Sequence, residues 1–260
     1  MKMVLKLALM LTVLYFSTAS ISFAADWCSE YGKSYDLDKQ IAACTDDINS
    51  GKYTGWDNRG INRLSTRYGN RCNAYSGKKQ YDQAIADCNK AIELDPKLAA
   101  LYLNRGNAYK GKKHYDQAIA DYNKAIELDP KFALAYINRG RTYSGKKQYD
   151  QAIADCNKAI ELDPKYALAY AERGDAYYYK KQYDQAIADY NRAIELDPKD
   201  ASSYYSIACI YSITGKSAYA CEWLKRSIDV GFNEWAHLKQ DTDFDKIRNT
   251  SCYKELMAGK

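Results

Sequence analysis

A period of 34 residues dominates the chain and limits what it can fold into. Two residue types mark this interval, namely the prolines Pro96, Pro130, Pro164 and Pro198 and the arginines Arg71, Arg105, Arg139 and Arg173. One copy of the repeat occupies residues 99–132, and close copies begin at residues 65, 133 and 167. A fixed period of this length indicates a repeat architecture, in which each repeat stacks on its neighbours to bury a shared core.

Each repeat contains two amphipathic segments separated by a turn. In residues 99–132 the first segment extends from about Ala99 to Lys110, and the second from about Tyr115 to Leu128. We expect Gly111 to permit the chain reversal between them and Pro130 to end the second helix. Spacings of three and four place the apolar residues of each segment on one helix face. They are Tyr102, Gly106 and Tyr109 in the first segment, and Ala118, Ile119, Tyr122, Ala125 and Ile126 in the second.

Aromatic and small residues keep fixed places within the repeat. Numbered from Ala99, the pattern is Tyr102 at 4, Gly106 at 8, Tyr109 at 11, Tyr115 at 17, Ala118 at 20, Tyr122 at 24, Ala125 at 27 and Pro130 at 32. It recurs in four repeats over residues 65–200 and resembles the tetratricopeptide repeat family. The resemblance implies an all-α, right-handed superhelical solenoid of helix-turn-helix repeats, with a concave groove lined mainly by the first helices. One departure is Arg105 at position 7, where the family usually has Leu. We expect its aliphatic stem to pack while the guanidinium reaches solvent.

Less regular segments flank the four regular repeats. Residues 25–64 are predicted to form an irregular N-terminal repeat and a connector, because IAACTDDI from Ile41 aligns with IADCNKAI from Ile85. Residues 201–234 are predicted to form a degenerate fifth repeat, as expected for the end of an array. Residues 235–260 are predicted to be a capping segment whose apolar residues cover the last helix pair. These apolar residues are Leu238, Phe244, Ile247, Tyr253 and Leu256.

The N-terminus is typical of a secretory signal peptide. Lys2 and Lys6 precede the apolar run Leu7 to Phe16, and Ser22-Phe23-Ala24 supplies small residues for cleavage. We therefore predict that residues 1–24 are removed and that the mature protein is periplasmic or secreted, without a membrane span. An uncleaved N-terminal anchor is the alternative interpretation.

Charge and histidine spacing argue against several classes of function. The formal net charge of +5 becomes +3 once Lys2 and Lys6 are removed, and acidic and basic residues are interspersed, so no nucleic-acid partner is expected. The chain has no Cys-x-x-Cys or His-x-x-x-His spacing, so no metal or other cofactor is predicted. His114 stands where the other repeats have Gln80, Gln148 and Gln182, which argues against a dedicated ligand or base.

Eight cysteines in an exported chain indicate disulfides. Position 8 of a repeat faces the second helix at its closest approach, so a cysteine there can reach one at position 24. Positions 9 and 21 are nearly symmetric about their turn, which makes a third bridge plausible. The predicted pairs are Cys28–Cys44, Cys72–Cys88 and Cys209–Cys221. Cys156 faces Gly140 and is predicted to be a buried thiol, and Cys252 is left either free or paired between chains.

The resemblance places positions 2, 5, 6, 9, 12 and 13 of each first helix on the concave groove. Amide side chains both donate and accept hydrogen bonds and therefore suit an extended peptide backbone. The alternative is that the asparagines are solvated helix residues copied by recent duplication. The predicted groove residues are Asn70, Asn73, Asn104, Asn107, Asn138, Arg141, Glu172, Asp175 and Tyr178.

Chaperone-binding members of the family resemble one another in a clamp that holds a terminal carboxylate. Asn73 and Asn104 match two positions of this clamp. Gly69 stands where the clamp has Lys, and Leu134 and Asn138 stand where it has basic residues. A chaperone terminus is therefore not the expected ligand.

These features predict an exported scaffold that binds another protein, or an extended peptide segment, through its groove. The alternative is a structural component of an envelope assembly that self-associates or bridges its neighbours. A cysteine-dependent enzyme is a third hypothesis, and it requires a thiol beside an oriented histidine. The regular repeats supply no such histidine, so no catalytic residue is predicted.

Overall fold

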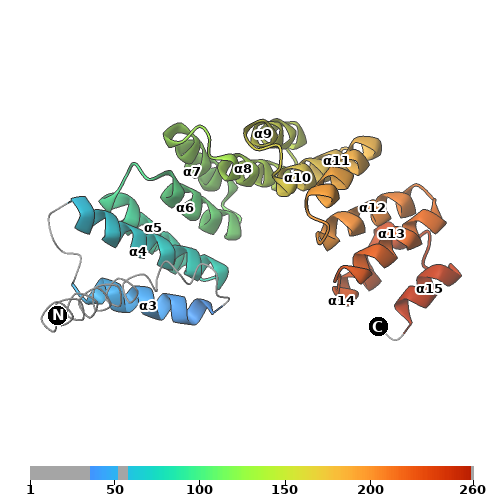
Figure 1. Cartoon of the computed structure of the whole chain (residues 1–260), viewed down its shortest axis with the longest axis horizontal. Helices are drawn as coiled ribbons and strands as arrows, with labels where there is room; N and C mark the ends of the chain where they lie inside the picture. The colour runs from blue at the N-terminus through green and yellow to red at the C-terminus, as the bar shows by residue number, and fades with distance from the viewer. Residues whose placement is uncertain (1–35, 52–57, 259–260) are drawn as a thin grey trace, which may run out of the picture. The chain divides into compact units, whose positions relative to one another are not determined.

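The computed structural model describes residues 36–51 and 58–258, and every regular element in these residues is a helix. The predicted signal peptide and Cys28 lie outside the described residues. The contacts between residues divide the chain into two compact units. The first ends at Asp129 and the second begins at Pro130 (Figure 1). Within each unit, consecutive helices pack in pairs, which confirms the predicted all-α fold of a tetratricopeptide solenoid.

The N-terminal unit contains two complete repeats and one leading helix. Helix α4 packs on α5 and α6 packs on α7, while α3 packs on α4 (Figure 1). The α4 helix begins within the segment predicted as a connector, so the last part of that connector is helical. The helices are α3 (Leu37–Asn49), α4 (Asn58–Gly77), α5 (Tyr81–Leu94), α6 (Ala99–Gly111) and α7 (Tyr115–Leu128).

The C-terminal unit contains three helix pairs and a tail of short helices. The helix pairs are α8 with α9, α10 with α11, and α12 with α13. In both units, α5, α7, α9 and α11 each end at the leucine before an Asp-Pro pair, where proline disfavours helical geometry in the residue before it. The elements are α8 (Ala133–Gly145), α9 (Tyr149–Leu162), α10 (Ala167–Tyr179), α11 (Tyr183–Leu196), α12 (Ala201–Ile213), α13 (Ser217–Asp229), α14 (Trp235–Gln240), the 3-10 helix η2 (Thr242–Phe244) and α15 (Ser251–Met257).

A glycine at position 8 lets the two helices of a repeat approach closely. A Cβ atom added to Gly106 would lie 2.7 Å from the ring of Tyr122, which is fully buried. In the fourth repeat, a Cβ on Gly174 would lie 2.8 Å from the ring of Tyr190. The large ring at position 24 thus occupies the space that the glycine leaves empty.

The turn between the two helices differs from the prediction. The residue with positive φ is Lys113, at 62°, and the equivalent lysines of the other repeats share this conformation. Gly111 instead belongs to α6 and is needed for close packing, since a Cβ there would collide with the ring of Tyr81. In the fourth repeat Tyr179 takes the place of this glycine, and its ring stacks on Tyr149 at 5.5 Å between centroids.

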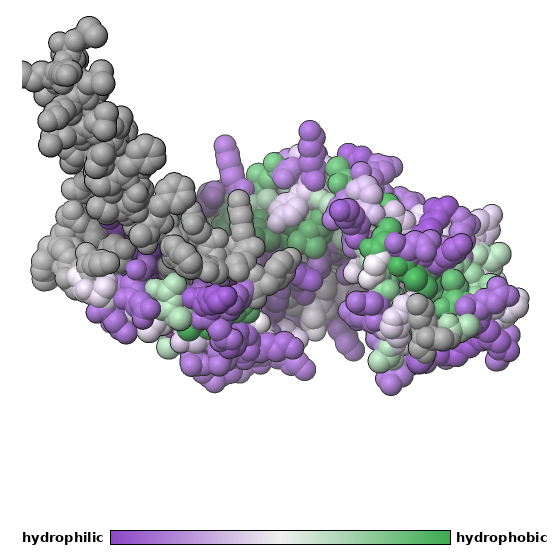
Figure 2. Space-filling model, turned by 60° about the horizontal axis from the view of Figure 1, so that its bottom comes forward, coloured by the Kyte–Doolittle hydropathy of each residue, from purple (hydrophilic) through white to green (hydrophobic). Residues whose placement is uncertain are grey.

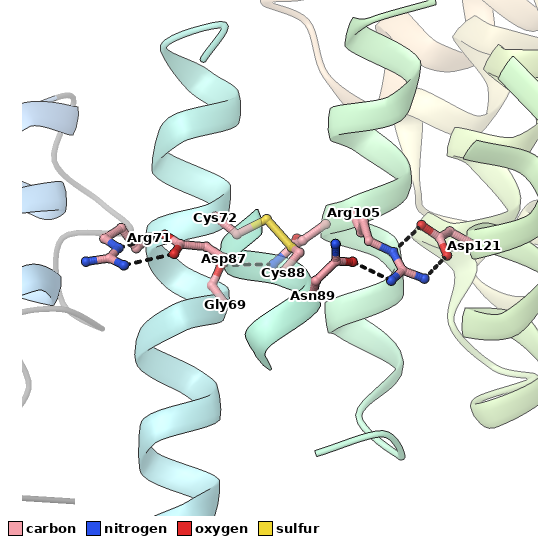
Figure 3. The surroundings of a disulfide bond; sticks show 9 residues. Gly69, Arg71, Cys72, Asp87, Cys88, Asn89, Arg105 and Asp121 are labelled. Carbon is pink, nitrogen blue, oxygen red and sulfur yellow. Dashed lines mark hydrogen bonds and ion pairs between the residues drawn. A yellow bond between two sulfur atoms is a disulfide. The ribbon is translucent and has the colours of Figure 1, made fainter. Parts of the chain in front are cut away.

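The arginine at position 7 does not extend its guanidinium into solvent as predicted. Arg105 donates from Nε and Nη2 to the two carboxylate oxygens of Asp121, at 2.8 and 2.7 Å, and from Nη1 to Asn89 of the preceding repeat at 2.7 Å (Figure 3). Arg173 repeats this arrangement with Asp189 and Asn157. The arginine is bidentate because its planar fork matches a carboxylate, and it therefore joins two helices of its own repeat to the previous repeat.

The equivalent arginine of the first regular repeat, Arg71, connects that repeat to the leading helix α3. Arg71 donates to Asp87 at 2.6 and 2.8 Å, and to the hydroxyl of Thr45 at 3.0 Å. The hydrogen bonds to the Asp87 carboxylate raise the pKa of Arg71 above its ordinary value. Thr45 thus stands where Asn89 stands in the next repeat, as the alignment of Ile41 with Ile85 requires.

Two disulfides are described, and one of them corrects a predicted pair. Cys72 and Cys88 are bridged with their Cα atoms 5.5 Å apart, in the register predicted for positions 8 and 24 (Figure 3). Cys221 is bridged to Cys252, and not to Cys209, which is a buried free thiol. One residue along a helix turns a side chain by about 100°, so position 9 no longer faces the second helix as position 8 does.

The other described cysteines are either buried thiols or disulfide-bonded. Cys156 is a fully buried free thiol on α9, as predicted. Cys44 is buried and disulfide-bonded, while Cys28, its predicted partner, lies outside the described residues. Cys252, left unassigned from the sequence, is carried by α15, which packs on α13.

The tail closes the C-terminal unit with apolar side chains. Leu238, Phe244 and Ile247 are fully buried in one core with residues of α12 and α13, and Tyr253 is nearly so. Leu256 packs against this core from its edge. No helix in the described part of the chain is long and apolar enough to cross a membrane. Figure 2 shows hydrophilic side chains over much of the visible described surface, with apolar patches between them.

Candidate functional site

The asparagines of the N-terminal unit are largely engaged in the fold. Asn107 accepts a hydrogen bond of 2.8 Å from the hydroxyl of Tyr122, the ring that fills the centre of its repeat. The amide nitrogen of Asn104 donates to the carbonyl oxygen of Gly69 at 3.4 Å. Asn73 is exposed, whereas Asn70 is half-buried. Asn104 and Asn107 therefore make hydrogen bonds within the fold, and none of the four asparagines lines either of the two described cavities.

Gly69, which stands where the carboxylate clamp has lysine, packs closely against the next repeat. A Cβ atom on Gly69 would lie 2.7 Å from a methyl carbon of Leu101, which is itself buried. A long basic side chain at this position would displace that leucine. The clamp lysine is thus missing from the sequence, and its place is also filled by the next repeat.

A cavity of about 470 Å³ lies between α10, α12 and the tail of the C-terminal unit. We call it the tyrosine cavity. Most of the tyrosines and the aspartates of its lining come from α10, from α12 and from the segment around η2, and Tyr190 of α11 adds a further ring. Those from α10, α12 and this segment are Asp175, Tyr178, Tyr179, Tyr205, Asp241 and Asp243.

A second cavity of about 360 Å³ adjoins the first, and we call it the serine cavity. Asp175, Tyr190 and Ser206 line both cavities, so the two adjoin along α10 and α12, and we refer to them together as the groove. Further side chains of the serine cavity come from α8, α10 and the start of α12. They are Arg141, Glu172, Asp200, Ser202 and Ser203.

The predicted groove residues of the C-terminal unit are divided between these cavities. Arg141 and Glu172 meet in the serine cavity as an ion pair of 2.7 Å, and Asp175 and Tyr178 line the tyrosine cavity. Asn138 is buried in α8. Four of the nine predicted groove residues are therefore brought to one groove, and they all come from the C-terminal unit.

Hydrogen bonds hold the walls of the tyrosine cavity in place. The hydroxyl of Tyr178 donates to the carboxylate of Asp243, and the hydroxyl of Tyr205 donates to that of Asp241. Tyr205 also stacks on Phe232, with 4.6 Å between ring centroids. These contacts tie α10 and α12 to the tail, so the carboxylates and the rings are fixed before any ligand arrives.

The electrostatics of the tyrosine cavity are negative. Among the described residues that line it, three are aspartates and none is lysine or arginine. Burial raises the pKa of Tyr178 and of Tyr205 well above the ordinary value, and the neighbouring aspartates raise both further. Burial likewise raises the pKa of Asp175, against the lowering effect of the hydrogen bond of 2.7 Å from Tyr190.

Three residues of this cavity have donor atoms close enough to share a metal ion. The ligand atoms of Cys209, Asp241 and Asp243 lie within 4.8 Å of one another. Burial and the two aspartates raise the pKa of the Cys209 thiol, whereas a metal would require the thiolate. A raised pKa also disfavours nucleophilic chemistry at this cysteine, although His237 lines the same cavity.

Tyr179 is expected beside Tyr178 at the aromatic end of the groove, and both line the tyrosine cavity. Asp241 and Asp243 were missed by the sequence reasoning, since the tail has no counterpart in the repeats. Only the packing of the tail against α12 brings them to the groove.

Paired antiparallel helices with a 34-residue period define this chain as a helical-repeat protein. Models of the tetratricopeptide repeat match most of the array: one matches residues 66–98, 99–132 and 133–166, and two others match residues 156–188 and 201–230. A TPR repeat model matches residues 174–215. The matches together run from residue 66 to residue 230, so the chain belongs to the tetratricopeptide repeat family.

Solved structures share this fold. MamA is 27% identical, with a TM-score of 0.54, over 66% of this chain and 96% of its own. YrrB, described as a TPR protein with an unusual peptide-binding site, is 24% identical with a TM-score of 0.52, over 76% of this chain and 97% of its own. BtubC from P. vanneervenii is 16% identical with a TM-score of 0.65, over 77% of this chain and 94% of its own. No curated protein matches the sequence.

Proposed function

We propose that this protein is an exported scaffold that binds another protein by holding an extended segment in the groove of its C-terminal unit. The observation that carries the proposal is the pair of adjoining cavities along α10 and α12, which share Asp175, Tyr190 and Ser206. Together they offer a continuous polar surface with aromatic walls. Ligand sites are commonly concave and combine apolar walls with a few placed polar groups.

The groove is suited to a peptide because its polar groups are already oriented. Asp200 accepts hydrogen bonds from the backbone of Ser202 and Ser203 and so fixes the start of α12 beside the serine cavity. Arg173 joins α10 to α11 through its bidentate contact with Asp189. A rigid groove lowers the entropic cost of binding, because few of its side chains must be ordered by the ligand.

The likeness to YrrB agrees with peptide binding but does not carry it. At 24% identity that likeness concerns the fold, and the peptide-binding site named for YrrB belongs to that protein. The weight of the proposal therefore rests on the groove itself. The partner we infer is a protein with an exposed, extended segment.

Export to the periplasm or the cell exterior is the second part of the proposal. It is supported by the lysines and apolar run of residues 1–16 and by the cleavage pattern ending at Ala24. The bridges Cys72–Cys88 and Cys221–Cys252 also favour an oxidising compartment. N-terminal sequencing of the protein from its native envelope fraction should begin at Ala25, and an intact Met1 would contradict export by cleavage.

Peptide selection tests the groove directly. Peptides selected from a random library on residues 25–260 should bind the protein in solution and lose about tenfold or more in affinity to Ser206→Arg, which places a bulky cation where the two cavities meet. The matched control is Ala218→Arg, which adds the same side chain at an exposed small residue of α13 outside both cavities. Circular dichroism should show unchanged helix content in both variants.

Two results would contradict the proposal. One is a selection that yields no binding peptide, and the other is a set of peptides that bind Ser206→Arg as tightly as the wild type. Sedimentation of the free protein distinguishes peptide binding from the structural alternative. A protein that acts by self-association should show a sedimentation coefficient that rises with concentration in the absence of any peptide.

A further inference from the structure

The tyrosine cavity differs in charge from the helix surfaces around it. Three carboxylates, those of Asp175, Asp241 and Asp243, face a space of about 470 Å³. Among the described residues that line this space there is no lysine or arginine, and the only basic side chain is that of His237, 3.7 Å from Asp241. A cluster of this kind in a partly enclosed site attracts positive charge.

The nearby lysines and arginines contact groups other than the carboxylates of this cavity. Lys180 pairs with Asp150 of α9, and Lys246 donates to the carbonyl oxygen of Ile213. Arg248 pairs with Asp245 at 2.8 Å and donates to the backbone carbonyl oxygens of Lys239 and Asp241, so its guanidinium contacts the main chain of one cavity residue. Among the described ion pairs, these basic side chains pair with carboxylates outside the cavity, and the one pair to a cavity carboxylate is that of His237 with Asp241.

Aromatic rings line the same space. The rings of Tyr178 and Tyr179 meet edge to face at 5.4 Å between centroids, and Tyr205 lies between Phe232 and Phe244 at 4.6 and 5.5 Å. The face of an aromatic ring attracts a cation through its quadrupole, and the effect grows when the cation is desolvated. Rings beside carboxylates are thus complementary to an organic cation with an apolar stem.

We propose that the tyrosine cavity binds the cationic side chain, lysine or arginine, of the partner segment that the groove holds. The stem of such a side chain lies against the tyrosine rings, and its charged end donates hydrogen bonds to the aspartates. The adjoining serine cavity holds the backbone of the same segment. This inference rests on the proposed function and adds the chemical class of the side chain that is recognised.

A basic side chain fits the site better than a metal ion. One oxygen of Asp243 accepts the Tyr178 hydroxyl. In Asp241 one oxygen accepts the Tyr205 hydroxyl and the Cys209 thiol, and the other accepts the backbone N–H of Asp243. Each carboxylate oxygen has two lone pairs, so an ammonium or guanidinium group can add to these bonds without breaking them. A metal held by Cys209 and the two aspartates would have to displace the thiol proton from a side chain that is almost fully buried.

The first test leaves the protein untouched. Among peptides selected on the wild-type protein, those that compete with one another should share a lysine or arginine. Replacing that residue by norleucine, which keeps the apolar stem and removes the charge, should weaken binding about tenfold or more. If peptides bind but norleucine is tolerated, the inference fails while the proposed function stands; if no peptide binds, the proposed function itself fails.

The second test changes the protein. Asp243→Asn keeps the shape of the side chain and an acceptor for Tyr178, but removes one charge. It should weaken the lysine peptide about tenfold and leave the norleucine peptide unchanged. Asp229→Asn, at an exposed aspartate of α13, is the control of equal net charge. Equal losses for both peptides, or equal losses in both variants, would overturn the inference, as would peptide binding that requires added Zn²⁺ and is abolished by EDTA.

Discussion

The second helices of repeats 65–98 and 133–166 have the same fourteen residues, YDQAIADCNKAIEL, yet their cysteines differ in chemical state. Cys88 is bridged to Cys72, whereas Cys156 is a free thiol that faces Gly140. Both sulfur atoms belong to fully buried residues. The difference lies entirely in the facing helix, where position 8 is cysteine in one repeat and glycine in the other.

The comparison shows which contacts are common to the repeats and which are individual. The residue before each cysteine, Asp87 or Asp155, accepts a bidentate ion pair from the arginine at position 7. This contact is the same in both repeats. The contact at position 8 varies along the array, as a disulfide, a ring against glycine, or a thiol against glycine.

The largest effect is expected when the shared ion pair is broken. Asp155→Ala leaves the partly buried guanidinium of Arg139 without its carboxylate, and we expect a loss of about 3–5 kcal/mol in the free energy of unfolding. Urea denaturation followed by circular dichroism measures it. Asp150→Ala on the same helix removes a largely exposed carboxylate and should cost about 1 kcal/mol or less. Similar losses for the two variants would show that Arg139 finds other partners.

Removing the bridge makes the first repeat resemble the third. Cys72→Ala leaves Cys88 as a buried thiol like Cys156, and we expect a loss of about 3 kcal/mol, because the bridge closes a loop of about 16 residues. The measurement is urea denaturation under oxidising conditions. The same change at Cys156 removes no bridge and should cost less. A larger loss for Cys156→Ala would contradict the assigned states.

Replacing the glycine at position 8 by alanine should destabilise the second repeat more than the third, because the facing side chain lies closer in the second. Gly106→Ala brings a Cβ to 2.7 Å from the ring of Tyr122, and overpacking of this kind should cost about 2–3 kcal/mol. Gly140→Ala brings a Cβ to 3.4 Å from the sulfur of Cys156, and to 3.2 Å from the carbonyl oxygen of Ala152, so it should cost less. Thermal melts of the two variants test the order, and equal melting temperatures would refute it.

A new bridge would convert the third repeat into a copy of the first. Gly140→Cys places a sulfur next to Cys156 across the same helix pair that Cys72 and Cys88 span. We expect a disulfide and a gain of about 1–2 kcal/mol, because engineered bridges give less than the loop length predicts. Alkylation of the denatured, unreduced protein followed by mass mapping should find Cys156 protected. An alkylated Cys156 would show that the helices cannot come close enough.

Much of the fold was predictable because the same residue pattern occurs in four consecutive repeats. Helix α7 begins and ends at Tyr115 and Leu128 as predicted, since the apolar spacing and the proline at 130 leave little choice. The turn was predicted less well. The sequence predicts the reversal at Gly111, but the positive φ falls on Lys113, and the glycine instead makes room for the ring of Tyr81.

The candidate site was predictable only in part. Repeat numbering predicts Asp175, Tyr178 and Asn107 in the groove. Asp175 and Tyr178 line the tyrosine cavity, whereas Asn107, at the same repeat position as Asp175, lines neither of the two described cavities. Asp241 and Asp243 belong to the tail, whose place against α12 depends on apolar contacts of Phe244 and not on any repeated pattern.

By itself, the sequence determined the all-α repeat architecture, the boundaries of the second helices and the register that pairs Cys72 with Cys88, because these follow from spacing along one helix and its immediate neighbour. Only the tertiary structure decided that Cys221 bonds Cys252 and that two aspartates of the tail meet two tyrosines of α10 and α12. Such contacts join segments with no common period. They depend on how the last helix pair and the tail pack together, and that packing is driven by non-directional burial of apolar area, which leaves no motif in the sequence.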